Sequence, residues 1–183
     1  MIGFVTPAGR LGMALLVSSV LQSQAAVAAP AQLLNKTIQV SWSTQVTQRG
    51  PDGQVVRPRI DASRTIYVSS AGRLFDRASR ENQKLRLKKS GDYAPDATRN
   101  KAGEARGLRF SGNTLVGNVG FAQGATQFTI SFDGSFSSCT VNVVYGRDGG
   151  GLRRRGLDGQ MYEIISTAVS GESCSVRAGN PFE

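Results

Sequence analysis

The stretch TIQVSWSTQVT, residues 37–47, decides the fold class of this chain. Larger, mostly apolar side chains alternate with small polar ones along its whole length. The first set is Ile38, Val40, Trp42, Thr44 and Val46. Successive side chains of a β-strand point to opposite faces, so the alternation predicts a strand with one buried face and one solvated face.

The same period of two returns further along the chain. In residues 126–133 it places Phe128, Ile130 and Phe132 on one face, and in residues 138–145 it aligns alternate residues from Cys139 to Tyr145. Weaker versions occupy residues 64–69, 115–121, 162–169 and 173–177. A long helical period is not found after the first 28 residues, so the sequence predicts an all-β fold.

Short turn signals separate these runs. Asp133-Gly134 predicts a tight type I′ hairpin between the Phe128 strand and the Cys139 strand, and Ser170-Gly171 is typical of another turn. Serial hairpins predict an antiparallel meander in a single domain. We expect a closed or partly closed β-barrel rather than a β-sandwich, because closure protects the sheet edges.

The N-terminus predicts export. Residues 11–21 are apolar and uncharged, follow Arg10, and precede the small-residue run AAVAAPA, in which Ala26-Val27-Ala28 fits signal peptidase. We expect residues 1–28 to be a signal peptide and residues 29–183 to be one periplasmic or secreted domain. The alternative is a retained membrane anchor, although the run is shorter than the ~20 residues that span a bilayer.

Two cysteines, Cys139 and Cys174, lie 35 positions apart. An exported chain passes through an oxidising compartment, so we expect one structural disulfide between them. A redox role would require closely spaced cysteines of the C-x-x-C kind. The outline of an export signal, one disulfide and short antiparallel strands resembles calycin-like barrels in architecture, without a family motif.

The chain contains no histidine, which excludes Ser-His-Asp and Cys-His catalysis and imidazole metal sites. The aspartates lie mostly in turns, where this residue is an ordinary turn former. Asp148 and Asp158 are the candidates for a calcium loop, yet their spacing lacks the pattern of an EF-hand. We therefore expect no enzyme activity, no cofactor and no metal.

The chain is basic, with 22 Lys and Arg against 13 Asp and Glu and a net charge of +9. Two clusters are the candidate anion-binding residues. They are Lys84, Arg86, Lys88 and Lys89 in KLRLKK, and Arg153, Arg154 and Arg155 in a glycine-rich segment. Such rows meet phosphates or acidic sugars; the alternative is a charged edge strand that blocks aggregation. Aromatic residues do not interleave with them, so nucleic acid is not favoured.

Together these features predict an exported, non-catalytic binding protein. Residues 90–106 and 146–160 are polar, read as long surface loops, and with the basic clusters form the expected contact surface. The first candidate partner is an anionic envelope component, either lipid or glycan. The alternatives are a small apolar ligand in a barrel cavity lined by Trp42, Phe128 and Phe132, which are otherwise core residues, and a protein partner that the chain inhibits or adapts. The oligomeric state stays open.

Overall fold

The computed structural model describes residues 28–77, 85–96, 102–105, 107–121, 124–145 and 152–183. These ranges contain thirteen β-strands, a short 3₁₀ turn, η1 (Ala31–Leu33), and no α-helix. The predicted all-β class is therefore confirmed. The expected signal peptide lies outside the described residues, apart from Ala28.

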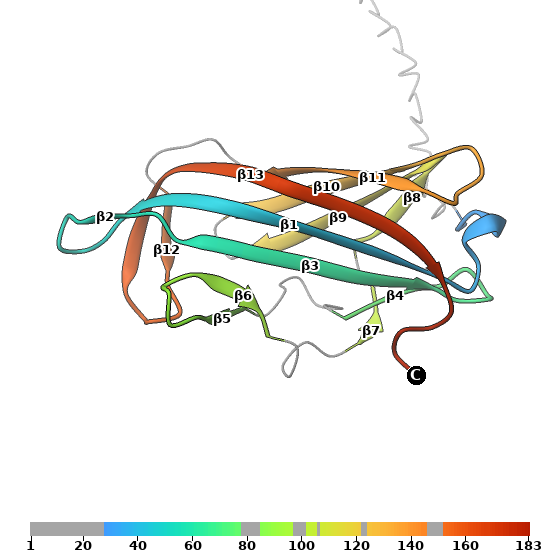
Figure 1. The fold of residues 1–183 in the computed structure, drawn as a ribbon, viewed down its shortest axis with the longest axis horizontal. Helices are drawn as coiled ribbons and strands as arrows, with labels where there is room; N and C mark the ends of the chain where they lie inside the picture. Colours follow the sequence, from blue (N-terminus) through green and yellow to red (C-terminus); the bar gives the residue numbers. More distant parts are fainter. Residues whose placement is uncertain (1–27, 78–84, 97–101, 106, 122–123, 146–151) are drawn as a thin grey trace, which may run out of the picture.

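Nine strands form sheet A. In chain order they are β1 (Lys36–Arg49), β2 (Val55–Val56), β3 (Arg59–Val68), β4 (Leu74–Asp76), β5 (Leu85–Leu87), β6 (Tyr93–Pro95), β7 (Gly103–Glu104), β12 (Leu152–Arg155) and β13 (Met161–Ala178). The main order is β12-β13-β1-β3-β4-β7, with β2 added to β1, and β6 and β5 added beside β3. The sheet is strongly curled, like half of a barrel (Figure 1).

Four strands form sheet B. They are β8 (Arg109–Ser111), β9 (Thr114–Phe121), β10 (Gly124–Phe132) and β11 (Cys139–Tyr145), in the spatial order β11-β10-β9-β8. No strand pairing joins sheet A to sheet B in the described ranges. Closure into a barrel thus stays a prediction, whereas a two-sheet arrangement with a half-barrel is observed.

Sheet B packs on the first half of β1, and the buried face that the alternation in residues 37–47 predicts is confirmed. Ile38, Val40 and Trp42 lie at most 4% exposed among side chains from both sheets. The contributions of sheet B include Phe110, Leu115, Phe128, Ile130, Phe132 and Val143. The polar residues Gln39, Ser41, Ser43 and Gln45 of β1 lie on the other face, and Ser and Thr residues of β3 and β13 continue this row, whereas Thr44 and Gln48 are buried.

One ion pair lies within this core. Arg64 of β3 and Asp76 of β4 are 2% and 1% exposed, and Arg64 Nε lies 3.0 Å from an Asp76 carboxylate oxygen. Arg64 also donates a hydrogen bond of 3.3 Å to the Asn118 carbonyl of sheet B and lies over the Phe128 ring. Burial lowers the pKa of Arg64 and raises the pKa of Asp76, and the charge of each opposes the shift of the other.

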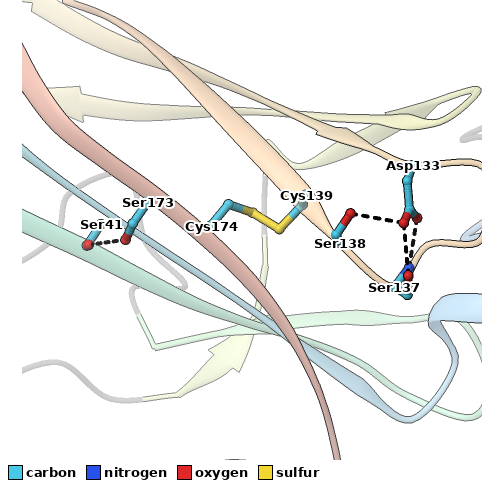
Figure 2. Close-up of a disulfide and its surroundings, with 7 residues drawn as sticks. All are labelled: Ser41, Asp133, Ser137, Ser138, Cys139, Ser173 and Cys174. Carbon is cyan, nitrogen blue, oxygen red and sulfur yellow. Dashed lines mark hydrogen bonds between the residues drawn. A yellow bond between two sulfur atoms is a disulfide. The ribbon is translucent and has the colours of Figure 1, made fainter.

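The predicted disulfide is present. Cys139 of β11 and Cys174 of β13 are bonded with their Cα atoms 5.5 Å apart. Figure 2 shows the bond crossing from one sheet to the other, between the Ser41–Ser173 hydroxyl pair and the Asp133 loop. The disulfide therefore joins the sheets where their edges carry no ladder hydrogen bonds.

The hairpin between β10 and β11 is real, but the predicted type I′ turn is wrong. Phe132 pairs with Cys139, so six residues connect the strands, and the positive φ angle falls on Phe136 rather than on Gly134. Phe136 enters the core and packs on Phe132, with ring centroids 5.4 Å apart. Asp133 accepts hydrogen bonds from Ser137 and Ser138. These bonds stabilise the wider loop and lower the pKa of Asp133.

The predicted turn at Ser170-Gly171 is also wrong, because β13 runs through it. Ser41 pairs with Ser173 and Ser43 pairs with Ser170, so two residues of β13 face the single residue Trp42. This arrangement is a β-bulge, and Gly171 supplies the positive φ of 65°. The Ser-Gly pair does mark a local change in the backbone. Because β1 pairs with β13 on both sides of it, the change is a bulge within one strand and not a turn between two strands.

The expected long loops are partly strands. Residues 93–95 and 103–104 form β6 and β7, and residues 152–155 form β12, paired with β13. β6 and β12 close the second half of sheet A over a small core of Val46, Ile60, Tyr93 and Ile164, with Leu152 beside it. Residues 97–101, 106 and 146–151 of the predicted loops lie outside the described residues. Figure 1 shows β2, β5, β6 and β12 at one end of the molecule.

Candidate binding cleft

A cleft of about 350 Å³ opens at this end of sheet A. Its walls come from the end of β1, from β2, from the β5–β6 hairpin and from the turn between β12 and β13. The lining residues are Gln48, Val56, Arg57, Pro58, Leu87, Ser90, Gly91, Asp92, Tyr93, Asp158 and Tyr162. Its volume lies within the range of ligand sites, and the mouth of a barrel-like sheet is a common place for one.

Three hairpin turns of the same geometry gather at this end, namely Gly50–Gln54, Lys88–Asp92 and Gly156–Gln160. In each, the first N–H donates to the carbonyl of the fifth residue at 2.7–2.8 Å, and the fourth N–H donates to the first carbonyl at 3.0 Å. The fourth residue is a glycine with φ between 82° and 84°. This is the three-residue loop of a type I turn followed by a left-handed residue, which fixes the position of each tip.

Two of these turns have nearly the same sequence, a repeat that the strand and turn patterns do not reveal. RGPDGQ, residues 49–54, and RGLDGQ, residues 155–160, differ at one position. In both, the aspartate Oδ1 accepts the glutamine N–H, at 3.1 and 3.0 Å. We call Gly50–Gln54 and Gly156–Gln160 the twin turns. A search for repeated hexapeptides would have found them.

The twin turns flank one aromatic ring, that of Tyr162. The first glycine of each turn approaches opposite edges of the ring, and a Cβ on Gly156 would come within 2.9 Å of it. The Tyr162 hydroxyl donates a hydrogen bond of 2.6 Å to Asp158. This bond, with smaller contributions from burial and neighbouring charges, raises the pKa of Tyr162 to about 12. The same bond lowers the pKa of Asp158.

The floor of the cleft is polar. Gln48 is 1% exposed, and its carbonyl oxygen accepts two hydrogen bonds from Arg154, at 3.2 and 3.0 Å. The Arg154 guanidinium lies 5.5 Å from the centre of the Tyr93 ring. Burial raises the pKa of Tyr93, although the charge of Arg154 opposes the shift. Arg154, predicted in an exposed loop, is thus held inside by strand pairing and a buried amide.

The carboxylates around the cleft have internal partners. Asp92 accepts hydrogen bonds from the Arg59 N–H at 2.8 Å and from Ser90 at 3.1 Å, and these two bonds lower its pKa. Asp61 binds Lys88 at 2.9 Å and Arg59 at 2.8 Å. Burial would raise the pKa of Asp61, but the hydrogen bonds from Lys88, Ser43 and Arg59 outweigh it and lower the pKa.

The structure brings the described members of both basic clusters to the same end. Arg86 and Lys89 of the β5–β6 hairpin and Arg153 of β12 are exposed and make no ion pair with another described residue. Lys88 is paired with Asp61, and Arg155 donates to the Gly159 carbonyl at 3.0 Å. Lys84 lies outside the described residues. Tyr93 links the clusters, since it pairs with Leu87 and contacts Arg154.

Five exposed apolar side chains lie on the segments that meet at this end, and two of them, Val56 and Leu87, line the cleft. They are Val55 at 50%, Val56 at 38%, Leu87 at 45%, Leu157 at 53% and Met161 at 43% exposure. Four of the five lie in or next to the twin turns. We refer to these five residues as the apolar collar. Only Leu87 alternates with basic residues in the sequence, in KLRLKK, and the meeting of the five at one end depends on pairing between distant segments.

The candidate cavity residues lie elsewhere. Trp42, Phe128 and Phe132 are at most 4% exposed and belong to the core between the sheets. The Trp42 and Phe128 rings have centroids 6.2 Å apart. None of the three lines the cleft or the smaller groove beside Thr37, Thr65 and Arg177 on the outer face.

Within the described ranges, no group of three or more His, Cys, Asp or Glu side chains is arranged to hold a metal ion. No helix among these residues is long and apolar enough to cross a membrane. Comparison with known proteins gave no significant match to a family model, a curated protein or a solved structure.

Proposed function

We propose that this chain is an exported, non-catalytic binding protein for anionic envelope components, and that the end bearing the cleft is its contact surface. The observation that carries the proposal is an imbalance of free charge at this end. Arg57, Arg86, Lys89 and Arg153 are exposed without an acidic partner among the described residues. The carboxylates beside them already accept internal hydrogen bonds.

Ionised groups held by internal hydrogen bonds have less capacity to attract outside cations, whereas free guanidinium and ammonium groups attract outside anions. The pKa values of Asp61, Asp92 and Asp158 are all lowered, so these groups stay ionised and bonded at neutral pH. An anion would therefore contact the rim, where the basic residues lie, rather than the floor of the cleft.

Export is supported by the uncharged run at residues 11–21 and by the disulfide, which persists in oxidising compartments. We propose that the two sheets together form a partly closed barrel. The Cys139–Cys174 bond would hold one seam between β11 and β13, and the short connection from β7 to β8 would span the other.

The test compares binding of the purified protein to vesicles containing phosphatidylglycerol and to heparin, a soluble anionic polysaccharide, over a range of salt concentrations. Each basic residue near an anionic surface contributes ~1 kcal/mol, so Arg86→Gln with Lys89→Gln and Arg153→Gln should weaken binding on the order of a hundredfold at low salt. Salt should weaken the wild-type protein far more than this variant.

The matched control is Arg177→Gln. Arg177 is also exposed on sheet A, but it pairs with Thr37 at the opposite end of β1. It should bind like the wild-type protein. Affinity for both probes that does not change with salt, or equal losses in the triple variant and in Arg177→Gln, would contradict the proposal.

A further inference from the structure

We infer that this end of the molecule docks on the surface of an anionic lipid bilayer, with the apolar collar inserted among the lipids. The inference rests on the proposed function, because it chooses lipid over glycan as the anionic partner. It assigns a role to the collar, which the basic residues alone do not explain.

The exposed apolar residues are concentrated at this end of the molecule. Seven large apolar side chains are strongly exposed in the described part of the chain, and five of them form the collar. Scattered exposed apolar residues are ordinary, but a concentration at one end marks an interaction site. The remaining two, Val144 and Ile165, lie on β11 and within β13.

Leu157 of the collar lies at the tip of a rigid turn, and the other four members lie on strands that lead into or out of the three turns. Pro51 and Leu157 occupy the same position in the twin turns, directly after the first glycine, and both are exposed. Turn tips normally carry polar residues because they face water. The close approach of Gly50 and Gly156 to the Tyr162 ring fixes the two tips relative to each other, so they project together.

Free basic residues and exposed apolar residues occur together at this end. Stable binding of a protein to a bilayer surface usually needs two signals, apolar insertion and basic residues at the headgroups. Here Arg57, Arg86, Lys89 and Arg153 accompany the collar. Tyr162, which lies between the twin turns, has the amphipathic ring that is enriched at membrane interfaces. A soluble glycan would satisfy the basic residues but would leave Leu157 and Val55 without a partner.

The test replaces the collar without touching charge. Val55→Ser with Leu157→Ser should weaken binding to phosphatidylglycerol vesicles at least ~10-fold, since each side chain loses most of its apolar surface. The same variant should bind heparin like the wild-type protein. The matched control is Val144→Ser, because Val144 is 56% exposed but lies on sheet B, and it should bind both probes normally.

Insertion is measured directly with Leu157→Trp. Its fluorescence should shift to shorter wavelength on phosphatidylglycerol vesicles and be quenched by brominated lipid, whereas Trp42, 4% exposed, should not respond. Vesicle binding without quenching, or equal vesicle affinity of the serine variant, would overturn the inference and leave the proposed function standing. If the wild-type protein binds neither vesicles nor heparin, the proposed function itself fails and the inference with it.

Discussion

The two ends of sheet A share the alternation of inward and outward residues along β1, but a core forms at one end and a cleft at the other. At one end, the inward residues of β1 are Ile38, Val40 and Trp42, and sheet B covers them completely. At the other end, the inward residues are Val46 and Gln48, and among the described residues the short strands β6 and β12 cover them. The alternation therefore specifies which face is buried, while the size and polarity of the inward residues determine whether a core or a cleft forms.

Each end also contains an arginine that points inward, with a different partner. Arg64 at the core end meets a carboxylate, and both groups are almost fully buried. Arg154 at the cleft end meets the neutral Gln48 amide and the Tyr93 ring, and it remains partly exposed. A buried charge that loses its counter-ion destabilises a protein strongly. The stability of the core end should therefore be far more sensitive than that of the cleft end to the loss of one partner.

The largest expected effect is therefore that of Asp76→Ala. It leaves the Arg64 charge buried without its counter-ion, which typically destabilises a protein by about 3–5 kcal/mol. Urea denaturation should show this loss in the free energy of unfolding. The corresponding change at the cleft end, Gln48→Ala, should cost less, because the partly exposed Arg154 can turn toward water.

A double substitution tests whether the unpaired Arg64 charge causes this loss of stability. Arg64→Met with Asp76→Leu replaces the pair by apolar groups of similar size and should recover most of the stability that Asp76→Ala loses. If Asp76→Ala and Gln48→Ala unfold at the same urea concentration as the wild-type protein, the distinction between the two ends is wrong.

The second effect concerns the link between the sheets. Cys139→Ser with Cys174→Ser removes a bond that closes a loop of 35 residues, and the chain-entropy model gives a loss of about 3–4 kcal/mol. Thermal unfolding under oxidising conditions should reveal it, and reductant should lower the melting temperature of the wild-type protein alone. Because the bond lies at the core end, vesicle binding by the folded variant should be unchanged.

Much of the core end could be predicted from local sequence. The inward face of β1, the faces of β10 and β11, and the disulfide follow from alternation and from the pairing of two cysteines. The errors there are local as well. The burial of Phe136 and the hydrogen bonds to Asp133 widen a turn that Asp133-Gly134 alone makes tight.

The cleft end was harder to predict because it depends on contacts between distant segments. β3 and β6 pair in parallel through Ile60 and Tyr93, and β12 is a strand because β13 offers it an edge. Arg154 turns inward because Gln48, 106 positions away, accepts its hydrogen bonds. The basic clusters were identified from sequence, but their meeting around a cleft was not. The twin turns were a local signal and were overlooked.

The smallest expected effect lies within the twin turns themselves. The Tyr162 hydroxyl donates a hydrogen bond to Asp158 of one turn, whereas Asp52 of the other turn acts on it only through its charge. Both raise the pKa of Tyr162, which is about 12. This pKa is raised above the ordinary value of a tyrosine. The contribution of the Tyr162–Asp158 hydrogen bond to the stability of the fold is therefore fully present below pH ~10 and is lost as the pH rises through about 12.

Asp158→Asn should lower the pKa of Tyr162 clearly, and Asp52→Asn should lower it less. Titration of tyrosinate ultraviolet absorbance measures both, with Tyr162→Phe identifying the transition. Equal shifts in the two variants would show that the turns act on Tyr162 through charge alone, without the hydrogen bond that distinguishes them.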